Sequence, residues 1–213
     1  MANKTRKLNC ASCEDKTCRN GKDCFGAAEQ HREIYRDERI DRLHRAASAI
    51  EARYYCKEPR LGETILFGKE LDCTTVGLAF CIGLASEAGI IREILSGHFK
   101  VVSVCCKACG INKKTFQLEQ ISPARENEVM CNPAGQAKLL DEAGSELNIT
   151  CGLCVGHDAI FNMTSQAPVT TLVVKDRVLA HNPVGAIYSQ YIRRDFIGEG
   201  SGPRRIVDVD FPV

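Results

Sequence analysis

Apolar and polar positions change their spacing repeatedly along the chain from residue 59 onward. Short, unbroken apolar runs are typical of strands buried on both faces, whereas apolar residues every three to four positions are typical of helices packed along one side. Strands are expected at TTVGLAF, FKVVSV, Leu147–Thr150 and VTTLVV, and helices at 61–71, 84–97, 133–144, 155–163 and from Pro183 to Arg194. This alternation predicts the α/β class, with a parallel, three-layer Rossmann-like sheet and with Val169–Val174 as an interior strand.

The chain before residue 59 has a different pattern. Apolar residues from Ile40 to Tyr54 recur at steps of three and four among charged residues, which predicts an amphipathic helix. Residues 1–24 are polar and carry four cysteines, with little else that could form a core. We therefore expect three parts: a cysteine-rich metal-binding knuckle at 1–24, a linking helix at 25–58, and an α/β domain with a cysteine-lined crevice at 59–213. The tail ends in IVDVDF, whose alternating pattern is typical of an edge strand. The apolar face of the linking helix would also allow a homodimer.

Composition narrows the class of protein. The 213 residues are 44% hydrophobic and 26% charged, with a net charge of +1, so the chain is globular and has no electrostatic case for binding nucleic acid. No apolar run is long enough to cross a membrane, and the first 25 residues do not form a signal peptide. A cytoplasmic location is the expectation.

Thirteen cysteines are the most unusual feature of the composition. In a reducing compartment they are not expected to form a disulfide framework, and metal ligation or thiol chemistry is the better interpretation. Four of them form the N-terminal pattern C-x2-C-x4-C-x5-C: Cys10, Cys13, Cys18 and Cys24. Four thiolates within so short a segment predict one metal centre, and both zinc and an iron–sulfur cluster accept four thiolates. The short, polar loop and the absence of an evident cavity favour zinc.

A second set of cysteines follows the expected strands. Cys81 comes directly after TTVGLAF, Cys105 and Cys106 after FKVVSV, and Cys154 after the strand at 147–150, while Cys131 precedes the helix at Pro133. The carboxyl ends of parallel strands meet at one edge, where ligands bind in open α/β sheets. These five cysteines are therefore expected to form one cofactor-binding cluster, which would hold an iron–sulfur cluster or a soft metal ion. The alternative for each is burial as a small apolar side chain.

Other polar residues stand beside these cysteines. His157 and Asp158 lie at the start of the helix after Cys154, where they would handle protons in a catalytic role. His181, after the last strand, is placed either at the same crevice or as a cap on the following turn. Cys56 and Cys73 are interpreted as structural, while the roles of Cys109 and Cys151 stay open.

Five segments together resemble a known family. They are FCIGLA (80–85), VSVCCK (102–107), MCNP (130–133), GLCVGHD (152–158) and APVTTLVVKDRVLAHNP (167–183). The pattern resembles a prokaryotic family of uncharacterised cysteine-rich proteins with predicted metal binding, over roughly residues 8–190. The resemblance implies a metal site involving Cys81, Cys105, Cys106, Cys131 and Cys154, together with the N-terminal knuckle. It supplies no reaction and no substrate.

Three functions remain open at this point. The first is a metal or iron–sulfur protein, which would be an enzyme if its crevice left an iron open to a small-molecule substrate. The second is a protein without turnover that stores, senses or delivers a metal. The third is a thiol–disulfide or persulfide carrier, with the C-x2-C pairs Cys106/Cys109 and Cys151/Cys154 as redox couples. No nucleotide-binding glycine motif accompanies a strand in this sequence.

Overall fold

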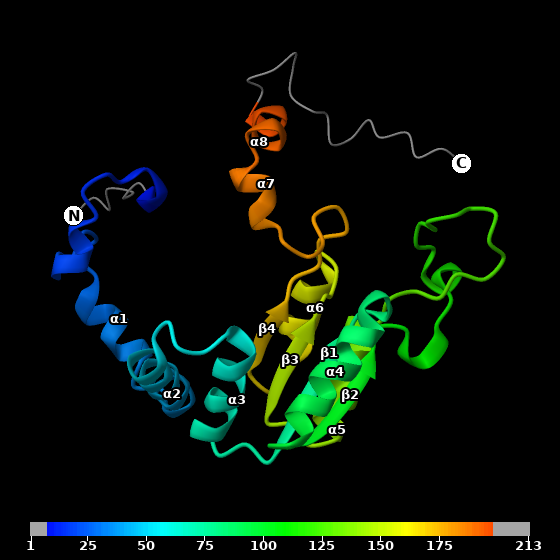
Figure 1. Ribbon diagram of the computed structural model, residues 1–213, viewed down its shortest axis with the longest axis horizontal. Helices are drawn as coiled ribbons and strands as arrows, with labels where there is room; N and C mark the ends of the chain where they lie inside the picture. Colours follow the sequence, from blue (N-terminus) through cyan, green and yellow to red (C-terminus); the bar gives the residue numbers. More distant parts are fainter. Residues whose placement is uncertain (1–7, 198–213) are drawn as a thin grey trace. The chain divides into compact units, whose positions relative to one another are not determined.

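The computed structural model describes residues 8–197, and the chain divides into two compact units after Tyr55 (Figure 1). The first unit contains single 3₁₀ turns at Cys10–Ser12 and Thr17–Asn20, then α1 (Ala28–Ile34) and α2 (Glu38–Tyr54). Asp37 caps α2 by accepting hydrogen bonds from the backbone of Arg39 and Ile40. Only Ala46 and Ile50 of α2 are buried, so this helix is amphipathic, as its spacing predicts.

The second unit is built on a four-stranded sheet. Its main elements are α3 (Arg60–Glu70), β1 (Thr75–Phe80), α4 (Ala85–Ser96), β2 (Lys100–Cys105), α5 (Pro133–Glu142), β3 (Leu147–Cys151), α6 (His157–Thr164), β4 (Val169–Val173), α7 (Val184–Tyr188) and α8 (Gln190–Ile197). All the paired strands run parallel, in the order β2-β1-β3-β4. The predicted α/β class with a parallel sheet is confirmed.

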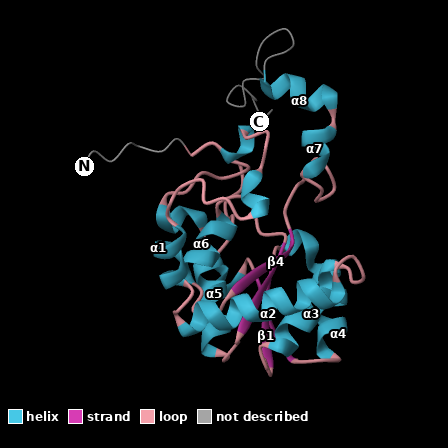
Figure 2. Ribbon diagram, turned by 90° about the vertical axis from the view of Figure 1, so that its left-hand side faces the viewer, coloured by secondary structure: helices cyan, strands magenta, loops and turns pink. Residues whose placement is uncertain are grey.

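Helices cover both faces of the sheet, which gives three layers (Figure 2). On one face, buried α4 residues such as Ile91 and Leu95 pack with Val76 and Leu78 of β1, and apolar residues of α3 join them. On the other face, α5 and α6 pack together and bury Leu140 and Phe161 against the sheet. The core therefore lies on both sides of β1 and β3, whose apolar runs need burial on both faces.

The position of β4 corrects one prediction. Among residues 8–197, Val169–Val173 pairs only with β3 and is an edge strand, not the interior strand that its β-branched sequence predicts. Its residues are half-buried throughout. The reason is that α3 packs on β4, and Arg60 donates hydrogen bonds to the carbonyl of Thr171 (2.7 Å) and to the hydroxyl of Thr170 (3.4 Å). A helix covers this edge, so an apolar strand can stand there without a second neighbour.

The chain reverses its direction of winding between β1 and β3. It leaves β1 through α4 to reach β2 on one side, and then crosses through α5 to β3 on the other side. Such a reversal leaves a crevice beyond the carboxyl ends of the two central strands, which is where open α/β sheets bind ligands. Gln136 of α5 is completely buried below this edge, and its side-chain nitrogen donates to the carbonyls of Phe80 (3.2 Å) and Val104 (2.7 Å).

A long loop between β2 and α5 returns to the same edge. Its two arms meet at an antiparallel bridge between Asn112 and Val129, and Lys113 pairs with the buried carboxylate of Glu128 at 2.6 Å. The backbone of Asn132 then donates to the carbonyl of Cys106 at 2.8 Å.

The segment expected as an edge strand, IVDVDF, lies outside the described residues. None of the helices between residues 8 and 197 is long and apolar enough to cross a membrane.

Candidate functional site

The carboxyl edge of the sheet gathers sulfur atoms from four separate segments. The last residue of β1, Phe80, is paired in register with Cys105 of β2 and with Cys151 of β3. The three strands therefore end at the same position along the sheet. The turns that follow them, and the loop into α5, carry four cysteines whose side chains interact, and we call them the thiol edge: Cys81, Cys106, Cys131 and Cys154. Most of the expected crevice cysteines are thus brought together.

Cys106 and Cys131 interact directly within the thiol edge. Cys106 is buried and donates a hydrogen bond to the sulfur of Cys131. This bond, with the nearby charges of Lys107 and His157, lowers the pKa of Cys131 to about 5 despite partial burial. The same bond, together with burial, raises the pKa of Cys106 far above that of an ordinary thiol. One sulfur is therefore a thiolate at neutral pH, and the other keeps its proton.

The neighbouring cysteines have different surroundings. Cys105 ends β2 and its sulfur accepts a hydrogen bond from the backbone of Lys107 at 3.5 Å. Cys106 turns inward instead, and its sulfur accepts from the backbone of Ile82 at 3.3 Å. Cys151 is fully buried in β3, and burial raises its pKa to about 11. Cys109 is exposed.

Two cations from the segment after β4 reach the thiol edge. Arg177 donates a hydrogen bond from Nη2 to Cys154 Sγ at 2.8 Å. Burial raises the pKa of Cys154 in spite of this positive charge. The side chain of Lys175 is buried, and its ammonium and the sulfur of Cys81 both border the space at Gly83: a Cβ placed on Gly83 would lie 3.6 Å from Lys175 Nζ and 3.9 Å from Cys81 Sγ.

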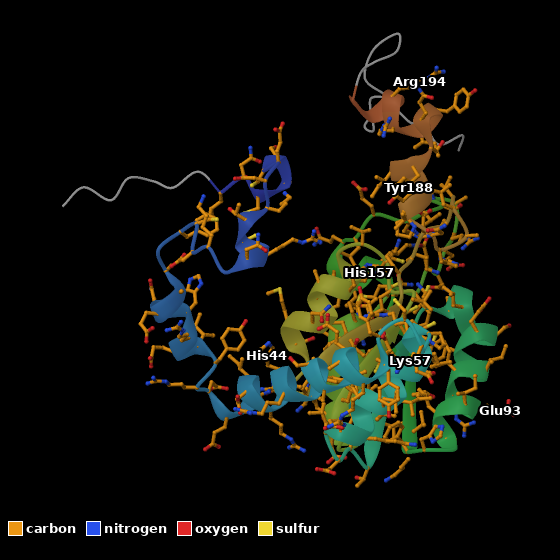
Figure 3. The ribbon with its side chains drawn as sticks, turned by 60° about the vertical axis from the view of Figure 1, so that its left-hand side comes forward. His44, Lys57, Glu93, His157, Tyr188 and Arg194 are labelled. Carbon is orange, nitrogen blue, oxygen red and sulfur yellow. The ribbon has the colours of Figure 1, made fainter. Side chains whose placement is uncertain are left out.

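The turn between β3 and α6 depends on a glycine. Gly152 has a φ of +65°, and a side chain there would meet Leu84 Cδ1 at 2.4 Å. Only glycine adopts this conformation without strain and leaves room for Leu84. The turn it allows carries Cys154, and His157 follows at the start of α6 (Figure 3).

The histidines and the acid expected at this site have distinct places. His157 is close enough to Cys131 for its charge to lower the pKa of that thiol. The carboxylate of Asp158 accepts a hydrogen bond from the next backbone N–H, that of Ala159, at 2.8 Å. His181 accepts from the backbone of Asp176 through Nδ1 at 3.1 Å, and therefore closes the loop that carries Lys175 and Arg177.

The N-terminal cysteines lie together in the first unit. All four line one pocket of about 420 Å³, whose other lining residues include Lys16, Lys22 and Phe25: the cysteines are Cys10, Cys13, Cys18 and Cys24. No residue from 8 to 25 is buried. Among residues 8–197, the structure has no group of three or more His, Cys, Asp or Glu side chains arranged closely enough to hold a metal ion.

Sequence reasoning centred on cysteine missed the cations of this edge. Lys107 follows Cys106 directly, and Lys175 and Arg177 follow the last strand at the same end of the sheet. The signal that could have found them is the rule already applied to the cysteines: residues just after parallel strands share one edge.

Comparison with known proteins places the chain in a family. Residues 19–172 match the family described as "Protein of unknown function (DUF1847)". The chain is 49% identical over 185 residues to the "Uncharacterized protein MJ0455" of Methanocaldococcus jannaschii, and this alignment covers 86% of the chain and 95% of the relative. No solved structure matches. The chain therefore belongs to the DUF1847 family, to which neither description assigns a reaction.

Proposed function

We propose that this DUF1847 protein carries an iron–sulfur cluster on Cys10, Cys13, Cys18 and Cys24. The observation that carries the proposal is the single pocket that all four cysteines line. They come from two short turns and the segment around them, and within residues 8–197 the pocket is lined only by residues between Asn9 and Phe25.

The volume of the pocket favours a cluster over a single zinc ion. In a tetrahedral zinc site with metal–sulfur distances of about 2.3 Å, the sulfur atoms stand only about 3.8 Å apart and enclose no free space. A pocket of about 420 Å³ has a volume that would admit a polynuclear centre. The short, polar loop and the lack of an evident buried cavity favoured zinc in the sequence, and the loop remains short and without buried residues, so the volume of the pocket alone supports a cluster. Lys16 and Lys22 line the same pocket and would offset the negative charge of a thiolate-bound cluster.

The test is the metal content of protein purified without oxygen. We expect brown protein with iron and acid-labile sulfide, and a broad visible absorption that Cys18→Ser abolishes. The matched control is Cys56→Ser, because Cys56 is an exposed thiol outside the pocket and outside the thiol edge. Colourless protein with one zinc ion, lost in Cys18→Ser, would replace the cluster by zinc. Wild-type protein without metal after reconstitution would overturn the proposal.

A second centre at the thiol edge is a separate candidate, favoured by the interactions among Cys81, Cys106, Cys131 and Cys154. Several cysteine sulfurs from separate loops would bind a soft metal ion or a cluster. Such a centre would either catalyse a reaction of a small molecule or hold a metal for delivery. Cys154→Ser should then lower the metal content without unfolding the protein. Unchanged metal content in Cys154→Ser would instead favour a thiol or persulfide carrier, with Cys131 and Cys106 as its reactive pair.

A further inference from the structure

The side chain of Lys175 is nine-tenths buried, and its ammonium, which still reaches solvent, has no partner among the described residues. Its exposed fraction is 9%, and its ammonium makes no hydrogen bond or ion pair with any residue between 8 and 197. Taking an ammonium out of water is costly unless an opposite charge or hydrogen-bond acceptors replace the lost hydration. The position of this group therefore points to a ligand that is itself negatively charged.

The space beside Lys175 is open at Gly83. Lys175 Nζ and Cys81 Sγ are the heavy atoms within 4 Å of the point that a Gly83 side chain would occupy, apart from the chain next to the glycine. Gly83 itself is exposed, so this space opens to solvent. It lies just after β1, at the point where the winding of the sheet reverses.

Further positive charge surrounds the same edge. Arg177 uses one guanidinium nitrogen on Cys154, and its remaining N–H groups are available for a ligand. Lys107 stands beside Cys131, with its ammonium bonded to the carbonyl of Val129 at 2.6 Å. His157 opens α6, whose N-terminus adds a favourable field for an anion.

The acidic residues near this edge do not cancel that charge. Glu87 is near enough to Cys151 for its negative charge to help raise the pKa of that thiol. Asp158 is engaged with the backbone of Ala159, and Asp176 accepts from the backbone of Val178 and Leu179 at 2.9 and 2.8 Å. The lysines and the arginine thus outnumber the carboxylate that remains.

We propose that Lys175 and Arg177 bind the oxyanionic group, carboxylate or phosphate, of a small ligand and hold that ligand against the thiol edge. The ammonium would bind one oxygen as a point charge, and the guanidinium would bind others through its planar N–H groups. The rest of the ligand would then lie over Cys81 and Cys154. This site goes beyond the N-terminal centre proposed above and does not depend on it.

The test is isothermal titration calorimetry of the full chain with inorganic phosphate and, separately, with acetate. We expect saturable binding of at least one anion, weakened about tenfold or more in Lys175→Met and in Arg177→Gln, because each loses a charge-assisted hydrogen bond. The matched control is Lys100→Met, which removes an exposed lysine from the opposite end of β2 and should leave binding unchanged. Phosphate and acetate distinguish the two kinds of oxyanion.

Gly83→Ala is a second probe that removes no charge. Its methyl group would stand in ordinary contact with Lys175 Nζ and Cys81 Sγ, so the protein should fold while the space for the ligand is reduced. We expect weaker anion binding with an unchanged melting temperature. The proposal is overturned if neither anion binds the wild type, or if Lys175→Met and Arg177→Gln bind as the wild type does. It is also overturned if these variants lose bound metal together with anion binding, because the cations would then serve the charge of a metal centre.

Discussion

Arg177 Nη2 donates a hydrogen bond to Cys154 Sγ over 2.8 Å, and this contact joins the loop after β4 to the turn after β3. The positive charge lowers the pKa of Cys154, while burial raises it, and burial has the larger effect. Arg177 therefore only partly offsets the effect of burial on the thiolate at Cys154.

Removing this charge should slow the reaction of Cys154 with electrophiles. In metal-free protein, Arg177→Gln should reduce the alkylation rate of Cys154 by iodoacetamide at pH 8 by several-fold, because losing the positive charge raises the pKa of the thiol further. Peptide mass spectrometry after timed alkylation measures this rate. Arg92→Gln, on the exposed side of α4, is the control and should react like the wild type. An equal rate in Arg177→Gln would mean that the contact does not influence the thiol.

Cys131 should titrate far below an ordinary cysteine. Its pKa of about 5 means that the thiolate predominates at neutral pH and that protonation removes it as the pH falls through 5. Alkylation of Cys131 in metal-free protein should therefore keep its rate from pH 8 down to pH 6, and fall tenfold per unit below pH 5. A thiol with the ordinary cysteine pKa would already slow below about pH 8.5.

Two variants separate the causes of this low pKa. Cys106→Ala removes the hydrogen-bond donor and should raise the alkylation midpoint of Cys131 more than Lys107→Met, because the bond from Cys106 is the larger cause. A wild-type midpoint near 8.5, or the opposite order of the two variants, would contradict this account of the pair.

Periodicity predicted the sheet because burial on one side or on both sides leaves a regular spacing of apolar residues. The same spacing could not place β4 at the edge. Val169–Val173 is covered by α3 through Arg60, and a strand covered by a helix has the same apolar sequence as one flanked by another strand. The prediction of an interior strand was wrong for this reason.

The cysteines of the edge were predictable as a group but not as individuals. Cys105 and Cys106 are adjacent in the sequence, and only the end of β2 decides that Cys106 turns inward to Cys131. The pairing of Cys106 with Cys131 depends on the loop held by Lys113 and Glu128, whose path no spacing rule describes. The place of Lys175 at the space beside Gly83 depends in the same way on the turn after β4.

Gly77 in β1 should not tolerate a side chain. A Cβ there would lie 2.0 Å from Asn148 Oδ1 and 3.0 Å from Leu140 Cδ1, and Asn148 is fully buried and bonded to Ser145 and Ser165. Gly77→Ala should therefore lower the free energy of unfolding by about 1–3 kcal/mol, the usual cost of overpacking a core. Urea denaturation of purified variants measures this change.

The control for this variant is a glycine with space around it. Nothing lies within 4 Å of a Cβ on Gly89, which is inside α4, so Gly89→Ala should raise the free energy of unfolding by about 0.5–1 kcal/mol through helix propensity. Equal effects of the two substitutions on the free energy of unfolding would show that the side chain of Asn148 can move away from the new methyl group at little cost.

The N-terminal segment should owe its order to the metal centre. Residues 8–25 contain no buried residue, and their 3₁₀ turns at Cys10–Ser12 and Thr17–Asn20 are too short to be stable alone. Trypsin can cleave after Lys16, Arg19 and Lys22, which all lie between the proposed ligands. Chelation of the metal should therefore speed cleavage at these sites by an order of magnitude or more, because opening of the segment would no longer require release of the centre.

The rest of the chain supplies the controls for this experiment. The α/β unit from residue 56 onward has its own core on both faces of the sheet, so its melting temperature should change little on chelation. Cys18→Ser without chelator should be cleaved as fast as the chelated wild type, and Cys56→Ser as slowly as the untreated wild type. Equal cleavage rates with and without metal would mean that the segment is held by something other than its four thiols.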